Sequence, residues 1–221
     1  IRKYGFHGTS HHYISARIAQ IEGREDLKII TCHLGNGSSI AAVKNGKCID
    51  TTMGLTPLEG LLMGTRSGDI DPAAIPYLMK KLNMSADETV NFLNKKCGVL
   101  GVSELSSDFR DLEKAAEEGN EKAITARTMF CYRIKKYIGA FAAALGGVDV
   151  IAFAGGVGEN DGGVREECIR GLDFLGAKMD PSTNNIRGKE MLISTPDSKV
   201  KIYIIPTNEE LMIARETKAL C

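Results

Sequence analysis

The sequence lacks an excess of charge of either sign. Its 28 lysines and arginines balance 28 aspartates and glutamates over 221 residues. Proteins that bind nucleic acid or membrane surfaces through bulk electrostatics carry a strong positive balance, so neither a nucleic acid nor a membrane is expected as a partner. Hydrophobic residues make up 43% and charged residues 25% of the chain, which is the composition of a soluble globular protein.

Paired cysteines at metal-ligand spacing are also absent. The six cysteines are scattered, without a C-x-x-C motif or a histidine at zinc-ligand spacing. They predict buried free thiols in a reducing cytoplasm. No signal peptide is recognised. The most apolar stretch, residues 137–157, is interrupted by Gly146, Gly147 and Asp149, and therefore predicts a helix and a strand rather than a membrane span. A cytoplasmic protein is expected.

The two common glycine-rich nucleotide fingerprints do not occur. No glycine loop ends in Gly-Lys-Ser or Gly-Lys-Thr, which excludes a Walker A motif. The glycines of residues 155–160 are misplaced for a Rossmann fingerprint, and their strand follows a helical run instead of opening a βαβ unit.

The stretch from Ile29 to Ser39, IITCHLGNGSS, is the strongest candidate for a binding loop. An apolar run ends there in a turn that contains His33 and Asn36 between glycines. Glycines let the backbone approach a ligand closely, and successive N–H groups can line a concavity that suits a phosphate. An Asn-Gly hairpin turn between two strands accounts for the same residues, and the two interpretations are compatible.

Hydrophobic periodicity predicts an alternation of strands and helices. Thr9 or Ser10 is expected to cap the first helix, and Ser85 with Glu88 is expected to form a capping box. The expected elements are a helix over residues 13–21, strands over 28–32, 39–44 and 47–52, helices that begin near 71, 85 and 108, a long helix over 120–145, a strand over 148–154, a helix over 163–172, a strand over 200–205 and a final helix capped by Thr207 and Glu210.

Three of these strands end in loops rich in glycine or carboxylate, at residues 33–39, 155–160 and 206–210. In an α/β sheet such loops lie at one edge, where ligands bind. Glu209 either complements the dipole of the final helix or, beside nucleotide phosphates, helps to hold Mg²⁺.

Two further segments have a structural and a functional interpretation. Residues 53–72 form a long loop whose apolar residues argue against a linker. The planar fork of its Arg66 suits a phosphoryl group, although a surface ion pair explains it equally well. Residues 2–12 contain three of the four histidines, which are either surface residues at a helix start or part of a site.

Six motifs, in this order, resemble those of the acetate kinase family. They are FHGTSH (6–11), TCHLGNGSS (31–39), PLEGLLMGTRSGDIDP (57–72), SDFRDL (107–112), GGVGEN (155–160) and PTNEE (206–210). The resemblance implies an α/β fold, a ribonuclease H-like (actin-like ATPase) domain with a mixed five-stranded sheet flanked by helices. It covers only about the carboxy-terminal half of the family's chain. The missing half supplies a first phosphate loop, a substrate-binding arginine and a catalytic aspartate.

The resemblance also implies roles for individual residues. His7 and Arg66 would be catalytic and stabilise the phosphoryl group in transfer. Phe6 and Pro57 would lie at the acyl pocket, and Glu209 would support Mg²⁺ or Mn²⁺. The residues implied to bind ATP or ADP are His33, Leu34, Gly35, Asn36, Gly37, Asp108, Phe109, Arg110, Gly156, Val157, Gly158, Glu159 and Asn160.

The function implied by the resemblance is reversible phosphoryl transfer from ATP to acetate, giving acetyl phosphate and ADP, in a homodimer. Residues 1–26 would form an amino-terminal segment. Residues 27–221 would form a nucleotide-binding and dimerisation domain, with 53–145 inserted as a loop and helices. Propionate kinase is the close alternative, and an inactive isolated lobe is another. A butyrate kinase and a non-enzymatic scaffold fit less well.

Overall fold

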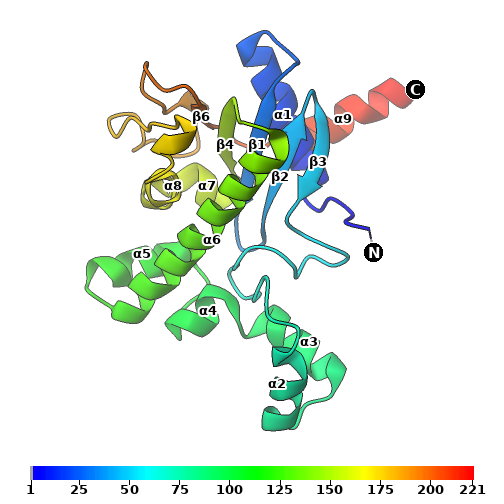
Figure 1. Ribbon diagram of the computed structural model, residues 1–221, viewed down its shortest axis with the longest axis vertical. Coiled ribbons are helices and arrows are strands. Elements are labelled where there is room, and N and C mark those ends of the chain that lie inside the picture. The colour runs from blue at the N-terminus through cyan, green and yellow to red at the C-terminus, as the bar shows by residue number, and fades with distance from the viewer. Residues whose placement is uncertain (1) are drawn as a thin grey trace.

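The computed structural model describes residues 2–221, and a mixed sheet lies at its centre (Figure 1). The strand order is β3-β2-β1-β4-β6-β5. The parallel pairs are β1 with β4 and β4 with β6, and the other neighbours are antiparallel. The strands are β1 (Lys28–Leu34), β2 (Ser38–Lys44), β3 (Lys47–Thr51), β4 (Val150–Ala154), β5 (Met191–Leu192) and β6 (Lys201–Ile204).

The helices occur in the predicted order, with some additions. They are α1 (Gly8–Glu22), α2 (Ala74–Leu82), α3 (Ala86–Lys95), α4 (Gly98–Ser103), α5 (Phe109–Glu117), α6 (Glu121–Leu145), α7 (Gly155–Asn160), α8 (Gly162–Ile169) and α9 (Glu209–Leu220), with a short 3₁₀ turn over Asp173–Leu175.

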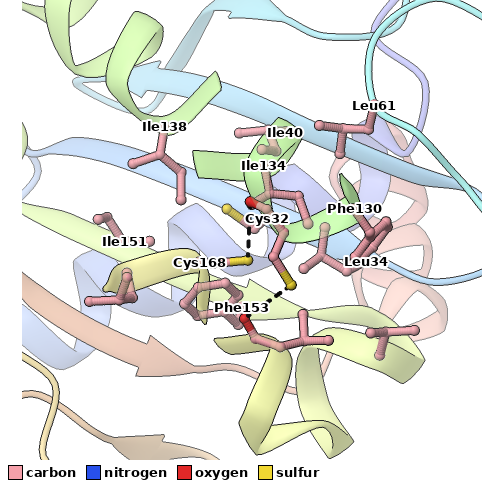
Figure 2. Close-up of a cluster of buried hydrophobic side chains, with 14 of the residues drawn as sticks. Cys32, Leu34, Ile40, Leu61, Phe130, Ile134, Ile138, Ile151, Phe153 and Cys168 are labelled. Atoms are coloured by element: carbon pink, nitrogen blue, oxygen red, sulfur yellow. Dashed lines mark hydrogen bonds between the residues drawn. The ribbon is translucent and has the colours of Figure 1, made fainter. Parts of the chain in front are cut away.

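Both faces of the central strands are buried, each against a different set of helices. Ile30, Cys32 and Leu34 of β1 belong to the larger core, which packs against α6 through residues such as Phe130 and Ile134 (Figure 2). The alternate residues face α1, where Ile14 and Ile18 join a smaller core. The long helix α6 crosses the first face, whereas α1 and α9 lie on the other side of the sheet (Figure 1).

Several local predictions are confirmed. Ser85 and Glu88 form the capping box at the start of α3. The helix expected to begin near residue 108 has Asp108 as its N-cap, and the long helix α6 begins after Asn120, which accepts a hydrogen bond as its N-cap. Gly146 ends α6 in a left-handed conformation with φ 67°. These features depend on residues close together in the sequence, so the sequence alone predicts them well.

The prediction of five strands was wrong by one, because β5 has only two residues and is too short to show an alternating pattern. The predicted glycine turn at residues 155–160 is instead the short helix α7. In addition, α2 begins at Ala74, after Pro72, and not at residue 71.

Two predicted helix caps were also wrong. Neither Thr9 nor Ser10 caps α1, because the helix begins earlier, after His7 in a left-handed conformation. The cap of α9 is Asn208, which accepts a hydrogen bond from the Leu211 N–H. The Thr207 hydroxyl instead donates a hydrogen bond to Ser10 Oγ, which belongs to a distant part of the sequence.

The prediction of buried thiols holds for half of the cysteines. Cys32, Cys131 and Cys168 are buried, and burial raises the pKa of Cys32 and Cys168. Cys48 and Cys221 are exposed. Among the helices of residues 2–221, none has the length and apolar character needed to cross a bilayer.

Candidate active site

Polar side chains gather on the α1 face of the sheet, near the end of β1 and the start of β2. Residues alternate between the faces of a strand, so Thr31 and His33 of β1 point to the same side as Ile29. Ser39 of β2 lies directly opposite His33 in the antiparallel register. The first turn of α1 covers this row and brings His7 to it.

Hydroxyl groups join the histidines at this edge into a network. His7 Nδ1 and His11 Nε2 each lie 2.8 Å from Ser39 Oγ. His11 Nδ1 lies 2.7 Å from Thr31 Oγ1. The rings of His7 and His33 are stacked, with centroids 4.2 Å apart. Three imidazoles that are separated along the chain are therefore held in one rigid group.

Burial keeps these imidazoles neutral. Desolvation, together with the neighbouring His33 and Arg66, lowers the pKa of His7 to about 4, although Glu209 acts in the opposite direction. Desolvation also lowers the pKa of His11 to about 3, and burial lowers that of His33. A neutral imidazole donates through one nitrogen and accepts through the other, so the histidine network can offer an N–H without carrying a positive charge.

Arg66 reaches the same region from the long loop that follows β3. Its Nη1 donates to the Pro57 carbonyl at 2.9 Å, so two predicted site residues are in contact. A Cβ on Gly37 would lie 3.4 Å from Arg66 Nη1, and the Gly64 N–H donates to the Asn36 carbonyl at 3.0 Å. Within residues 2–221 Arg66 has hydrogen bonds to Pro57 and Met63 and no ion pair, so the alternative of a surface ion pair is wrong.

The ends of β4 and β6 meet the end of β1. Gly155 has φ 76°, and a Cβ there would lie 2.7 Å from the Leu34 carbonyl oxygen, so this close approach requires glycine. Glu159 Oε1 accepts from the Gly155 N–H at 2.8 Å and from the Thr207 N–H at 3.1 Å. The predicted convergence of three strand ends at one edge is confirmed by these contacts.

A cavity of about 600 Å³ opens beside this edge. Its walls come from the turn after β1, the start of α5, helix α7 and the loop before β5. It is lined by Gly35, Asn36, Ser107, Asp108, Phe109, Arg110, Glu113, Gly156, Val157, Asn160, Asp161 and Arg187. Hydrogen bonds from Arg110 hold the Asp108 carboxylate in its ionised form and lower its pKa to about 2.

A fully buried arginine supports the far wall of this cavity. Arg165 Nη1 donates to the Gly158 carbonyl at 2.9 Å, and its other nitrogens donate to Asn184 and to the Ile186 carbonyl. Burial lowers the pKa of Arg165 to about 10. Arg165 therefore ties α7 to the loop that carries Arg187.

The cavity gathers most, but not all, of the residues predicted to bind nucleotide. Those that line it are Gly35, Asn36, Asp108, Phe109, Arg110, Gly156, Val157 and Asn160. The side chain of Leu34 lies in the core, Gly158 packs behind the wall, and Glu159 is occupied by backbone N–H groups. His33 belongs to the histidine network, and Gly37 lies against Arg66. Phe6, which was predicted at the acyl pocket, packs on the edge of the larger core.

The sequence interpretation missed four lining residues, Ser107, Glu113, Asp161 and Arg187. Ser107 is the first residue of the SDFRDL motif and Asp161 directly follows GGVGEN, so both could have been included on that ground. Glu113 lies one turn beyond Phe109 on α5, at a spacing that puts both on one side of the helix. Arg187 lies in an irregular loop whose sequence carries no signal.

Glu209 is the first residue of α9. No group of three or more potential ligands (His, Cys, Asp or Glu) that could hold a metal ion occurs within the described range 2–221. Mg²⁺ in nucleotide sites is bound through one or two carboxylates plus phosphates and water, so a single carboxylate such as Glu209 fits that mode and not a cage made only of protein groups.

The acetokinase family matches residues 1–215 of the chain. The acetate kinase of Thermoanaerobacterium thermosaccharolyticum is 63% identical over an alignment of 223 positions, which covers 100% of this chain and 56% of that protein. The chain belongs to the acetokinase family. The acetate kinase of Bacillus velezensis is 60% identical, again over 100% of this chain and 56% of its own length.

Solved structures of acetokinases agree with this assignment. Porphyromonas gingivalis acetate kinase superposes with a TM-score of 0.97 at 54% identity, over 99% of this chain and 56% of that one. A propionate kinase from Francisella tularensis gives 0.92 at 44% identity, over 98% and 55%. The chain thus has the predicted α/β acetokinase fold, with six strands in its sheet, and spans about half the length of the curated relatives it matches.

Proposed function

We propose that this chain is the carboxy-terminal, nucleotide-binding half of an acetate kinase, which transfers the γ-phosphoryl group of ATP reversibly to acetate and forms acetyl phosphate and ADP. The observation that carries the proposal is the position of the turn after β1. Gly35 and Asn36 line the cavity, while the adjacent Gly37 lies against Arg66. A nucleotide in the cavity would therefore direct its phosphates toward Arg66.

The reaction needs positioning and charge stabilisation more than covalent assistance. An acetate oxygen attacks the γ-phosphorus, and the bond between that phosphorus and the bridging oxygen of ADP breaks. Charge spreads over the equatorial oxygens during transfer. Preorganised donors in a partly dry site stabilise such charge strongly, and Arg66 and His7 are the donors proposed for this role.

We propose the following binding roles for the other residues of the site. The purine nucleoside would lie between the 107–110 segment and α7, which form facing walls of the cavity. Bound Mg²⁺ would neutralise phosphate charge, with Glu209 as its protein carboxylate. Phe6 and Pro57 would border the acyl pocket.

The organisation of the chain is part of the proposal. Residues 27–221 would form a nucleotide-binding and dimerisation domain of a cytoplasmic homodimer, preceded by the segment 1–26, with 53–145 as an insertion. The second candidate is a propionate kinase, favoured by the high structural similarity to the Francisella protein. The two acids differ by one methylene, which a pocket discriminates only weakly.

The first test is nucleotide binding by this chain. We expect Mg-ATP and Mg-ADP to raise its melting temperature in a saturable manner, because a ligand that binds only the folded state stabilises it. Gly156→Trp should abolish the shift by filling the cavity. Gly139→Trp, in α6 and outside the cavity lining, should retain it, since no atom of residues 2–221 beyond its neighbours in the helix lies within 4 Å of a Cβ added there. No shift in the folded wild-type chain would contradict binding by this half alone.

The second test is activity in a chimera. This chain would replace the matching segment of the Thermoanaerobacterium enzyme, with which it is 63% identical. We expect ATP-dependent formation of acetyl phosphate. Comparison of kcat/KM for acetate and propionate then decides between the two candidate substrates. A folded chimera that transfers to neither acid would contradict the proposal.

A further inference from the structure

His7 has a fixed hydrogen-bond partner on one side of its ring only. Within residues 2–221 this partner is Ser39, whose Oγ lies 2.8 Å from His7 Nδ1. The other ring nitrogen, Nε2, is thus the one available to a substrate. Because the ring is neutral at pH 7, Nε2 is either an N–H donor or a bare acceptor, and only the donor can stabilise negative charge on a phosphoryl group.

The proton of Ser39 couples His7 to a second imidazole. Ser39 Oγ lies 2.8 Å from both His7 Nδ1 and His11 Nε2. Within residues 2–221 Ser39 Oγ has no hydrogen-bond partner besides these two nitrogens. Its one proton is therefore donated to one of them, and its oxygen accepts from the other. With both rings neutral, the two histidines must therefore have the same tautomer, either Nε2–H in both or Nδ1–H in both.

Thr31 selects between these two arrangements. Its Oγ1 lies 2.7 Å from His11 Nδ1 but 3.4 Å from its other neighbour, the Ala41 carbonyl oxygen. O–H···O hydrogen bonds are normally 2.5 to 3.0 Å long, so the Thr31 proton is better placed on His11 than on the carbonyl. A Thr31 that donates to Nδ1 leaves His11 protonated at Nε2.

We propose that Thr31, His11 and Ser39 form a directional hydrogen-bond chain that holds neutral His7 in its Nε2–H tautomer. The direction runs from the Thr31 hydroxyl to His11 Nδ1, from His11 Nε2–H to Ser39, and from the Ser39 hydroxyl to His7 Nδ1. Thr31, His11 and Ser39 are then positioning residues, because they act through His7 and do not touch the substrate. The role of this hydrogen-bond chain in phosphoryl transfer rests on the proposed function. The assignment of the tautomer does not depend on that function.

The burial of the residues in this hydrogen-bond chain supports the assignment. Thr31 and Ser39 are fully buried and His11 is 5% exposed, so water does not compete for their hydrogen bonds. Buried hydrogen-bonded groups have few alternative partners, and a reversed or broken chain would leave a polar group without one. His33 provides an internal reference, because its Nδ1 bonds to Ser10, 2.8 Å away, and not to Ser39.

Long-range proton–nitrogen correlation spectra of the histidine rings in the 221-residue chain test the proposal directly, since they distinguish protonated from bare ring nitrogens. Variants that remove each ring in turn assign the signals. In the wild-type chain at pH 7 we expect His7 and His11 each to show a bare Nδ1 and a protonated Nε2. A protonated Nδ1 on His7 would overturn the proposal.

Two variants test the hydrogen-bond chain itself. Ser39→Ala leaves His7 with neither nitrogen held, so both tautomers of His7 should appear, while Ser39→Thr retains the hydroxyl and should restore the single form. A pure Nε2–H form of His7 in Ser39→Ala would show that Ser39 does not select it. If Ser39→Ala does not fold, Thr31→Val gives the second measurement, with Thr31→Ser as its control and mixed tautomers of His7 and His11 as the expected result. Unchanged tautomers in Thr31→Val would also contradict the proposed hydrogen-bond chain.

The measurement separates this inference from the proposed function. It needs neither nucleotide nor turnover, so a chain that shows the expected tautomers but no kinase activity in the chimera would contradict only the proposed function. Conversely, an active chimera with the Nδ1–H tautomer on His7 would contradict only this inference. The tautomer of His33, whose Nδ1 bonds to Ser10, should stay the same in Ser39→Ala, which checks that the substitution acts locally.

Discussion

Arg165 donates a hydrogen bond to the carbonyl of Gly158 at 2.9 Å from a position with no solvent exposure. The same guanidinium bonds to Asn184 and to the Ile186 carbonyl. One buried side chain thus holds both α7 and the neighbouring loop in the shape that forms the cavity wall.

Arg165→Met should therefore destabilise the protein substantially. Several buried oxygens would lose their donor, and each unsatisfied group costs about 1–3 kcal/mol, so we expect a loss of at least ~3 kcal/mol in the free energy of unfolding, measured by urea denaturation. The matched control is Arg187→Met, whose exposed side chain makes one ion pair within residues 2–221, with Glu113 at 3.8 Å. That change should cost less than about 1 kcal/mol. Equal effects of the two substitutions would contradict the assigned role of Arg165.

Gly155 and Gly156 provide a second matched pair. Gly155→Ala places a Cβ 2.7 Å from the Leu34 carbonyl oxygen at φ 76°, whereas Gly156→Ala meets no atom within 4 Å in the described part of the chain beyond its own neighbours. We expect Gly155→Ala to lower the free energy of unfolding by about 1–3 kcal/mol, the usual cost of a strained backbone, and to weaken Mg-ADP binding as well. Gly156→Ala should change stability by less than about 1 kcal/mol. Thermal unfolding of both variants decides the matter, and the reverse order of stabilities would refute the close approach of β4 to β1.

Arg66→Ala should reduce turnover in the chimera by on the order of a hundredfold or more, the typical effect of removing one donor that stabilises transition-state charge. The appropriate control is Arg170→Ala, since Arg170 is the exposed residue that caps the C-terminus of α8 and its ion pairs within residues 2–221 are with Glu166 and Glu167. Its kcat should stay within about twofold of the wild type. Near-normal turnover in Arg66→Ala would remove Arg66 from the proposed site.

Acid should destabilise the fold through the buried histidines. The pKa of His11 is lowered to about 3 in the folded chain, from an ordinary value of 6.5. Between these values the unfolded chain binds more protons, so the free energy of unfolding falls as the pH falls below 6.5. From pH 7 to pH 5 His11 alone should account for a loss of about 2 kcal/mol.

Urea denaturation at both pH values measures this loss. His7, whose pKa is lowered to about 4, acts in the same direction. The variant His11→Asn should show a pH dependence weaker by about the 2 kcal/mol assigned to His11. An identical pH dependence in His11→Asn and in the wild type would show that His11 is not held neutral by the fold.

Features that depend on neighbouring residues were predictable from the sequence. The capping box of Ser85 and Glu88 and the glycine that ends α6 involve residues within one helical turn. The three strand-end loops were recognised because glycines and carboxylates directly follow apolar runs. The motifs also predicted most of the cavity lining, since the predicted residues of 108–110 and of α7 contribute to two of its walls.

Features that depend on distant residues were not predictable in this way. The Thr207 and Glu210 pair looks like a capping box, yet Thr207 bonds to Ser10, which is 197 residues away. The two-residue strand β5 exists only because β6 offers it an open edge. Arg165 resembles any charged residue of a short helix until the fold surrounds it with carbonyl groups.

The sequence by itself determined the family, the order of the main elements and the residues that gather at one edge of the sheet, because apolar periodicity and local motifs are properties of short segments. The tertiary structure decided which of these residues line the cavity and which lie behind it. It also decided that Thr31, His11, Ser39 and His7 form one hydrogen-bonded chain. Their contacts arise only when α1 packs on paired strands, since the register that sets Ser39 opposite His33 joins residues from different elements.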